Sequence, residues 1–271
     1  MKIYFIYRCL YGEDFIQQSI LSVKDYADKI LVFWTDTPFG NISEVIYKGI
    51  TQPIPKPIDR ILDRINELEL PNLMTYYAHF PDPMNQVTVL INDYVLPNYE
   101  KPDLIIFLEP DMVWRKDQLE LALKFIPDQI SYVKQVELWK TPQFRIPERA
   151  KRPGAIFYNM KNLSQVPPTG RDGCPAPVSR VPAIPTLIHN FGFCVSERNM
   201  LWKHMLALGF AKLIGDRVPN EDWYEKKWLS WDFETNNKNL EISRGREHWI
   251  PCAVPYTDEL PETIEWTKWT K

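Results

Sequence analysis

Two carboxylates follow the strongest strand signal in the sequence. The apolar run PDLIIFL (residues 102–108) leads directly into Glu109, Pro110 and Asp111. Pro110 favours an extended backbone for the residue before it, which keeps both acids at the end of the predicted strand. Magnesium and manganese ions prefer oxygen ligands, typically one or two carboxylates together with substrate phosphates. Glu109 and Asp111 are therefore candidates for a metal site, and the alternative is a polar strand end with solvated acids.

A second acidic group precedes a predicted helix. Asn220, Glu221 and Asp222 come just before an aromatic face with helical spacing at residues 224–231. Asparagine is a favourable N-cap and acids in the first turn interact well with the helix dipole, so capping alone explains the motif. The functional alternative makes Asp222 a general base, which the helix N-terminus keeps ionised and ready to take a proton from a hydroxyl group.

Two single residues are further candidates. Gly192 lies within a strand-like run, NFGF (residues 190–193), where a glycine marks either a bulge or a close approach of backbone or ligand. His248 lies late in the chain in the segment REHWIP. A neutral imidazole can complete a metal site, although a single histidine is more often structural.

Strand and helix signals alternate through the first half of the chain. The expected strands cover residues 2–7, 29–35, 72–77 and 102–108, and the expected helices residues 16–27, 58–68 and 84–94. This alternation predicts an α/β fold with a parallel sheet built from βαβ units. Ligands of such sheets bind beyond the carboxyl ends of the strands, so functional residues should follow Tyr7, Thr35 and Leu108. Arg8 and Asp36 occupy two of these places.

The second half of the chain is less regular. Strands are expected at residues 131–138 and 189–195, and helices through residues 201–208 and 224–231. Residues 141–185 hold nine of the 24 prolines and show little periodicity. That composition predicts a long loop or insertion.

The order of these features resembles the glycosyltransferase A fold, and within it the inverting family-2-like enzymes. The features are alternating strands and helices, an acid after the second strand, two acids after the fourth, a glycine segment, an N-E-D and a late histidine. The resemblance covers residues 1–115 and, more loosely, residues 186–250. It implies a Rossmann-like, mostly parallel sheet with helices on both faces, in a single domain over residues 1–271.

The resemblance also implies a role for each matched residue. The donor, a nucleotide-diphosphate sugar such as a UDP-sugar, would contact Arg8, Asp36, Glu109 and Gly192. A Mn²⁺ or Mg²⁺ ion would be held by Asp111 and His248. Asp222 would be the catalytic base, with Glu221 and Trp223 beside it on the acceptor. The sequence departs from the family at Glu109, where the first aspartate is usual, and residues 141–185 match no part of the family pattern.

The implied reaction moves a sugar to an acceptor hydroxyl in one displacement that inverts the anomeric configuration. A divalent cation stabilises the charge that develops on the leaving diphosphate, and Asp222 would take the proton of the attacking hydroxyl. Residues 1–115 would bind the nucleotide sugar. Residues 116–271 would bind the acceptor and contain the basic, Pro-rich insertion at about 140–185.

The charge distribution is uneven in this insertion. Residues 140–180 contain eight Lys/Arg and two Asp/Glu, a balance of +6, so the remainder carries −9 of the total of −3. The basic residues include Arg145, Arg149, Lys151 and Arg152, and the interleaved aromatic residues are Phe144, Phe157 and Tyr158. Cations alternating with aromatic rings suit a nucleic-acid backbone and an exposed base.

The basic insertion leads to a hypothesis about the acceptor. A glycosyltransferase with such a basic segment resembles, in general concept, the phage-type glycosyltransferases that modify hydroxymethylated pyrimidines in DNA. The alternatives are a solvated loop, or a loop that clamps the donor diphosphate. Saccharide, protein and lipid-linked acceptors also stay open.

Composition and cysteine usage indicate the compartment. With 271 residues, 45% hydrophobic and 25% charged, the chain suits one α/β domain with insertions, or one domain plus a small lobe. Its four cysteines have neither zinc-site nor redox spacing, which favours reduced thiols and a reducing compartment. The apolar run at the N-terminus is too short for a signal peptide, and no stretch matches a membrane span. We therefore expect a cytoplasmic protein of a bacterial or virus-infected cell, not a secreted one.

Two other classes of function compete with this interpretation. A nucleotidyltransferase would need a glycine-rich phosphate loop with Arg and Lys after the first strand, and residues 7–12 contain a single glycine. A catalytically inactive module that binds nucleotide sugar or nucleic acid is the second class. In such a module, replacement of Asp222 would leave binding intact.

Overall fold

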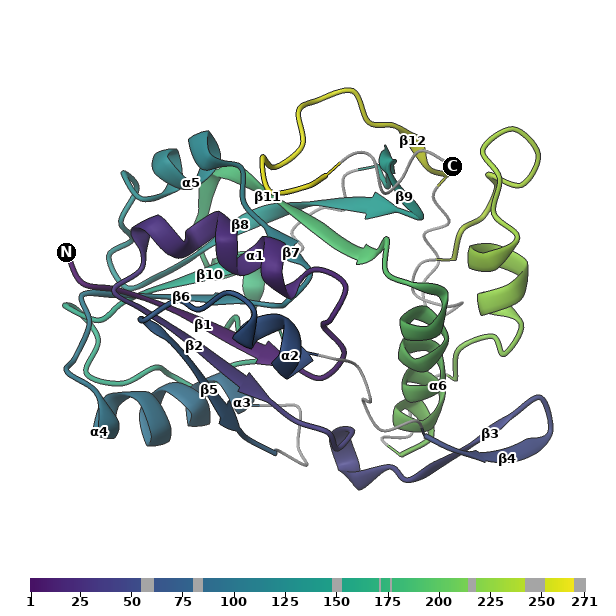
Figure 1. Ribbon diagram of the computed structural model, residues 1–271, viewed down its shortest axis with the longest axis horizontal. Coiled ribbons are helices and arrows are strands. Elements are labelled where there is room, and N and C mark those ends of the chain that lie inside the picture. Colours follow the sequence, from purple (N-terminus) through teal and green to yellow (C-terminus); the bar gives the residue numbers. More distant parts are fainter. Residues whose placement is uncertain are drawn as a thin grey trace.

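A ten-stranded mixed sheet forms the centre of the molecule (Figure 1). The computed structural model describes residues 1–54, 61–79, 85–147, 153–170, 172–175, 177–213, 218–241 and 252–265. The strands of the sheet are β1 (Ile3–Cys9), β2 (Lys29–Trp34), β5 (Leu73–Tyr77), β6 (Leu104–Leu108), β7 (Met112–Val113), β8 (Ile130–Trp139), β9 (Thr141–Arg145), β10 (Pro153–Asn159), β11 (Ala183–Phe193) and β12 (Val254–Pro255). A separate hairpin is formed by β3 (Glu44–Tyr47) and β4 (Ile50–Pro53).

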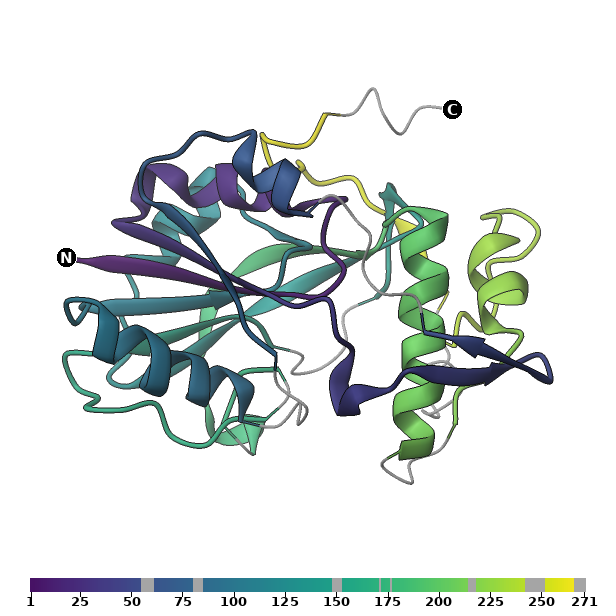
Figure 2. The same cartoon turned by 60° about the horizontal axis from the view of Figure 1, so that its bottom comes forward.

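Helices cover both faces of the sheet (Figure 2). The helical elements are α1 (Ile16–Val23), η1 (Lys24–Tyr26), η2 (Phe39–Asn41), α2 (Ile61–Asn66), α3 (Gln86–Val89), η3 (Leu90–Val95), α4 (Leu96–Asn98), α5 (Lys116–Ala122), η4 (Val178–Arg180), α6 (Glu197–Leu213) and η5 (Tyr224–Leu229). Successive side chains of a strand point to opposite faces. Phe5 of β1 therefore joins the core under α1, α2 and α5, while its neighbour Tyr4 joins the core under α3 and η3.

The four strands of the first half are parallel neighbours in the order β5-β2-β1-β6. The chain adds β2 and β5 on one side of β1 and then returns to place β6 on its other side. The direction of winding thus reverses between β1 and β6. A reversal of this kind opens a crevice outside the carboxyl ends of the two strands, where α/β sheets bind ligands.

The predicted fold class is confirmed. Strands β8, β11 and β12 run in the same direction as β1, whereas β7, β9 and β10 run against it, so seven of the ten strands share one direction. The sheet is therefore mostly parallel, and each of its antiparallel pairs includes a strand from the second half of the chain.

The prediction of a long loop or insertion over residues 141–185 was wrong for the parts that form β9, β10 and the start of β11. β10 lies between β6 and β8, antiparallel to both, and is buried along its whole length. A Cβ at Gly154 would lie 2.5 Å from Cγ2 of Ile188 in β11 and 3.0 Å from the carbonyl oxygen of Val133 in β8, so only glycine leaves room for both. A fully buried strand has no polar alternation, and the prolines around it masked its short apolar run. The β3–β4 hairpin was also not predicted.

A second hydrophobic core lies beyond the strand ends, around α6 and η5. Its largest buried side chains are Trp139, Trp223 and Trp228, which pack against Phe191 and Phe193 of β11. No helix in the described part of the chain has the length and apolar character needed to cross a membrane. All four cysteines are free thiols, as the sequence predicted.

His189 of β11 gives the fold a measurable pH dependence. Its ring is 2% exposed and its Nε2 lies 2.6 Å from the hydroxyl of Tyr256. Burial, reinforced by the nearby charge of Arg115, lowers the pKa of His189 to about 4. In the unfolded chain the ring has an ordinary pKa of ~6.5, so below that pH the unfolded state binds the extra proton.

We therefore expect the His189 contribution to stability to be present above pH ~6.5 and to be lost as the pH falls toward ~4. Between pH 7 and pH 5 the free energy of unfolding should drop by about 2 kcal/mol from this group. Urea unfolding across this range measures the drop, and His189→Gln should show a correspondingly shallower slope. An identical slope in the variant would contradict the assignment.

Candidate active site at the carboxyl edge of the sheet

Backbone hydrogen bonds fix the loop that carries Glu109 and Asp111. The Met112 amide donates to the Glu109 carbonyl at 3.0 Å, which closes a tight turn around Pro110. The Phe191 amide donates to the Asp111 carbonyl at 2.8 Å and continues the short pairing of β7 with β11. Both acids are thus held at the carboxyl end of β6, where the sequence placed them.

Arg8 and Glu109 meet across the point where the winding direction reverses. Nη2 of Arg8, at the end of β1, lies 2.6 Å from Oε1 of Glu109, and Nη1 donates to Oε1 of Gln86 at 3.0 Å. The Arg8 side chain is 11% exposed and that of Glu109 is 34% exposed. A charge-assisted hydrogen bond between such partly buried side chains is stronger than an ion pair on the exposed surface.

A second ion pair joins Asp111 to α6. Nζ of Lys203 lies 3.0 Å from Oδ2 of Asp111, with side chains 22% and 13% exposed. The other oxygen, Oδ1, is buried and has no hydrogen-bond partner among the described residues. A buried carboxylate oxygen without a donor is costly, so this oxygen is suited to an additional cation.

The loop after β1 positions α6 for this contact. Oδ2 of Asp14 accepts hydrogen bonds from the Ser196 amide at 3.1 Å and from Nδ2 of Asn199 at 2.7 Å. Asn199 and Lys203 are four residues apart and therefore share a face of α6. That face points toward the loops at the strand ends, whereas His204 contacts the Glu221 carbonyl on another side of the helix.

Gly192 lies against the same carboxylate. A Cβ at this position would stand 3.1 Å from Oδ2 of Asp111 and 2.8 Å from Oδ1 of Asn190. The Gly192 amide donates to that Asn190 oxygen at 2.8 Å, where the register of β11 on β8 shifts. The glycine is therefore both at a bulge and at a close approach, the two alternatives that the sequence left open.

Asp36 lies along the same edge, at the end of β2, which is the strand next to β1. The Thr35 amide extends the pairing of β2 with β1 by donating to the Cys9 carbonyl at 3.0 Å. Oδ1 of Asp36 then accepts from the hydroxyl of Thr37 at 2.9 Å and from the hydroxyl of Tyr77, at the end of β5, at 3.0 Å. Arg8, Asp36, Glu109, Asp111 and Gly192 are thus all at the carboxyl edge.

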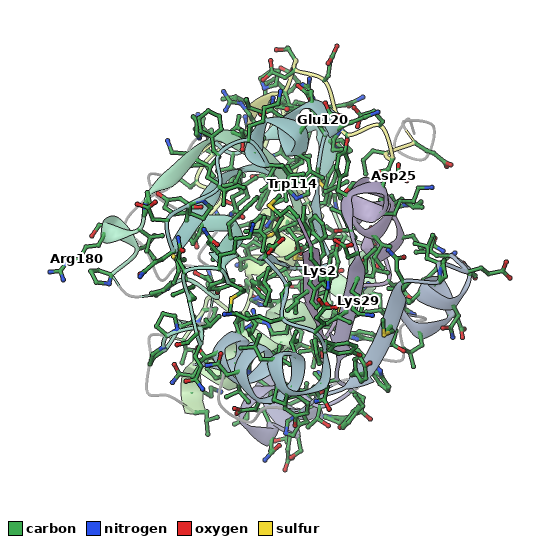
Figure 3. All side chains as sticks on the ribbon, turned by 90° about the vertical axis from the view of Figure 1, so that its left-hand side faces the viewer. Lys2, Asp25, Lys29, Trp114, Glu120 and Arg180 are labelled. Carbon is green, nitrogen blue, oxygen red and sulfur yellow. The ribbon has the colours of Figure 1, made fainter. Side chains whose placement is uncertain are left out.

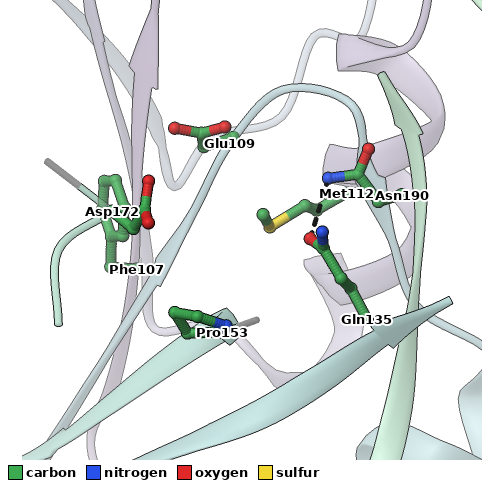
Figure 4. Close-up of a pocket in the computed structure, with 7 residues that line it drawn as sticks. All are labelled: Phe107, Glu109, Met112, Gln135, Pro153, Asp172 and Asn190. Atoms are coloured by element: carbon green, nitrogen blue, oxygen red, sulfur yellow. Dashed lines mark hydrogen bonds between the residues drawn. The ribbon is translucent and has the colours of Figure 1, made fainter. Parts of the chain in front are cut away.

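A small pocket opens beside Glu109 (Figure 4). Glu109 and Asp172 lie on one side of it, and Asn190 lies on the other side with its Nδ2 donating to Oε1 of Gln135 at 3.0 Å. Phe107, Met112 and Pro153 supply apolar surface. An apolar wall with a few convergent polar groups is the usual composition of a small-molecule site.

The donor set at this edge fits a hard divalent cation. Its members are carboxylate oxygens, and the orphaned Oδ1 of Asp111 offers one ligand without breaking a contact. The described residues contain no group of three or more His, Cys, Asp or Glu side chains that could hold a metal by themselves. Substrate phosphates and water would have to complete the coordination, as is common for Mg²⁺. His248 lies outside the described residues.

Asp222 lies away from the acids at the carboxyl edge of the sheet. Its carboxylate accepts a hydrogen bond from Nζ of Lys226 at 2.6 Å, and its backbone amide donates to Oδ1 of Asn220 at 3.1 Å. The hydrogen bond from Lys226 and its charge hold the pKa of Asp222 below its usual value. In both ribbon views η5, the helix that follows Asp222, lies on the far side of α6 from the tips of β1 and β2.

The neighbours of Asp222 have structural partners. Oε2 of Glu221 accepts from the Lys48 amide in the β3–β4 turn at 3.2 Å. Trp223 is fully buried and donates through Nε1 to the Leu240 carbonyl at 2.9 Å. The prediction that Trp223 contacts an acceptor was therefore wrong, because its ring is part of the second hydrophobic core.

The basic segment does not gather into one patch in the described part of the chain. Arg145 pairs with Leu138 near the end of β8, whereas Arg180 precedes β11 beside the beginning of β8, at the edge that Figure 3 faces. Phe157 and Tyr158 are buried in β10 and are not available for stacking. Arg149, Lys151 and Arg152 lie outside the described residues.

Four polar residues of this site were not predicted: Gln86, Gln135, Asp172 and Lys203. Each comes from a segment with no local motif. The helix that carries Lys203 was predicted from the spacing of its apolar residues alone, which says nothing about its polar face. The spacing of Asn199 and Lys203 on one face of α6 was the available signal for the lysine.

Gly192 provides a direct test of this geometry. Gly192→Ala places a methyl group within 3.1 Å of Oδ2 of Asp111 and 2.8 Å of Oδ1 of Asn190, so one of these groups must move. We expect a loss of ~1–3 kcal/mol in the free energy of unfolding, measured with urea. Gly170→Ala is the matched control, because its nearest contact would be the Cys174 carbonyl at 3.3 Å. Equal losses in the two variants would contradict the close approach.

Comparisons with protein-family models and with curated proteins gave no match. The chain is similar to the solved structure of TarS 1–349 of S. aureus, with a TM-score of 0.41, 13% sequence identity, and coverage of 91% of this chain and 73% of that chain. It is similar to glucosyl-3-phosphoglycerate synthase from Mycobacterium tuberculosis in complex with Mn²⁺, UDP and phosphoglyceric acid, with a TM-score of 0.37, 11% identity, and coverage of 81% and 80%. It is also similar to galactosyltransferase LgtC in complex with donor and acceptor sugar analogues, with a TM-score of 0.32, 11% identity, and coverage of 60% and 59%.

Proposed function

We propose that this chain is a metal-dependent glycosyltransferase that moves a sugar from a nucleotide-diphosphate sugar to an acceptor hydroxyl with inversion of configuration. The observation that carries the proposal is the charged cluster at the reversal point of the sheet. There Arg8 contacts Glu109 at 2.6 Å, and Asp111 follows two residues later with one oxygen unpartnered among the described residues. This is the place where doubly wound sheets bind nucleotides.

The parts of a nucleotide-sugar donor match the order of residues along this edge. Asp36, two strands from Glu109, has the carboxylate chemistry to accept hydrogen bonds from the nucleoside. Arg8 and Lys203 supply positive charge for the diphosphate, and the pocket between Glu109 and Asn190 offers polar groups for the sugar. A divalent cation bound at Asp111 would stabilise the negative charge that develops on the leaving diphosphate.

The attacking hydroxyl needs a base. We keep Asp222 as the proposed base on the strength of the N-E-D motif, although η5, which follows it, lies on the far side of α6 from the tips of β1 and β2. Asp172 is the competing carboxylate, since it lines the pocket beside Glu109. Removal of the base should leave the donor bound and unreactive, so paired variants of the two aspartates separate the assignments.

The acceptor hypothesis changes with the structure. Burial of Phe157 and Tyr158 leaves Phe144 as the one of the three interleaved aromatic residues that is partly exposed, and the described arginines of the basic segment lie at opposite ends of β8. A hydroxymethylated pyrimidine in DNA therefore stays one acceptor class beside saccharides and proteins, and the test has an arm for each.

The test of the function is a donor and acceptor screen. UDP-, GDP- and TDP-sugars are each incubated with Mn²⁺ or Mg²⁺, or with EDTA, and release of the nucleoside diphosphate is measured. We expect release with one donor, and only when a divalent cation is present. A rise on adding duplex DNA with hydroxymethylcytosine or hydroxymethyluracil would identify the acceptor as DNA, and a rise with oligosaccharides would identify it as a saccharide. Nucleotide-sugar binding without release under any condition would favour an inactive binding module.

The base is tested with the donor so identified. Asp222→Asn should keep donor affinity and lose transfer by ~10²-fold or more, as expected for removal of a positioned base. Asp172→Asn is the matched control, with the same change of charge at the pocket. Full transfer in Asp222→Asn together with loss in Asp172→Asn would move the role to Asp172.

A further inference from the structure

Lys203 binds the carboxylate that the proposed function assigns to the metal. Its Nζ lies 3.0 Å from Oδ2 of Asp111, and both side chains are largely removed from water, with exposed fractions of 22% and 13%. An ammonium group and a divalent cation both seek the oxygens of one carboxylate. The contact between Lys203 and Asp111 therefore affects the affinity of the site for a metal ion, in addition to attaching α6.

The two oxygens of Asp111 are in different states. Oδ2 receives the ammonium and also faces Gly192, whereas Oδ1 is buried and without a partner among the described residues. A divalent cation at Oδ1 would lie on the same carboxylate as the Lys203 charge. In a site of low effective dielectric, repulsion between two such close positive charges is strong.

The surroundings hold Lys203 in this place. α6 is attached at its beginning to the loop after β1 through Asp14, and Lys203 lies one turn beyond Asn199 on the same face. The neighbouring acid, Glu109, is paired with Arg8 at 2.6 Å. In the described structure Asp111 is thus the partner of Lys203 through Oδ2, and a metal ion at Oδ1 would share the carboxylate with the lysine.

We propose that Lys203 is an internal counter-cation of Asp111, which neutralises this carboxylate in the free protein and lowers its affinity for a divalent metal. A metal ion bound at Oδ1 is then disfavoured by the charge of the ammonium that remains at Oδ2. The inference rests on the proposed function only in taking Asp111 as a metal ligand. It adds that Lys203 sets the metal affinity.

The test measures metal binding without any nucleotide sugar. Mn²⁺ is titrated into the protein and free Mn²⁺ is followed by electron paramagnetic resonance. Lys203→Met removes the charge while keeping much of the side-chain volume, and we expect the Kd for Mn²⁺ to fall roughly tenfold or more, the value of one charge-assisted hydrogen bond. Lys203→Arg keeps the charge and should retain a Kd near that of the wild type.

Two controls restrict the interpretation. Lys227 is also 22% exposed and lies 3.5 Å from Oε1 of Glu241, in the region of η5, so Lys227→Met should leave the Kd unchanged. Asp111→Asn should abolish the binding that Lys203→Met tightens. Mn²⁺ binding that survives in Asp111→Asn would place the measured site elsewhere and overturn the inference.

Stability gives a second readout, because Lys203→Met leaves Asp111 without its cation. The variant should unfold at a lower temperature in EDTA, and saturating Mn²⁺ should raise its Tm by more than that of the wild type. If Lys203→Met does not fold, Lys203→Gln keeps a hydrogen-bond donor and carries the same expectation. An unchanged or higher Kd for Mn²⁺ in the neutral variants, or no Mn²⁺ binding in any of them, overturns the inference, whereas the proposed function stands or fails with nucleotide release in the screen.

Discussion

The need to balance charge at the reversal point of the sheet governs the arrangement of the site. Glu109 and Asp111 are two residues apart at the tip of β6, and each is only partly exposed. Carboxylates taken out of water need a cationic partner, because their desolvation is otherwise unfavourable. Arg8 from β1 and Lys203 from α6 meet this need. The pairing of β1 with β6 and the attachment of α6 to the loop after β1 position the two cations.

The sequence was informative where the position of a residue in the fold follows directly from the local order of strands and helices. The parallel strands β1, β2, β5 and β6 were predicted because each is a short apolar run between helical faces. Arg8, Asp36, Glu109 and Asp111 were then placed at one edge, since the carboxyl ends of parallel strands meet there. Gly192 was found from its position in a strand-like run, and the structure shows that it approaches Asp111.

The parts that were missed depend on contacts between distant segments. β10 has a proline-rich context, and nothing local reveals that it is inserted between β6 and β8. Lys203 pairs with a residue 92 positions away, so its role follows from the orientation of α6 and from no motif. Trp223 was assigned to the acceptor because it follows Asp222 in the sequence, and its burial depends on packing against distant segments that no local motif reveals.

The balance of charge also has a consequence for how ligands bind together. Arg8 and Lys203 neutralise Glu109 and Asp111, so the described ion pairs of the edge carry no net charge. A divalent cation alone would share the Asp111 carboxylate with the positive charge of Lys203, and a diphosphate alone would face two carboxylates. The cation and the diphosphate of a nucleotide sugar together bring no net charge, and the diphosphate oxygens are a new partner for the ammonium group. If the edge binds a metal ion and a nucleotide sugar as proposed, its charges would favour the two ligands together over either one alone, which would be a thermodynamic coupling between them.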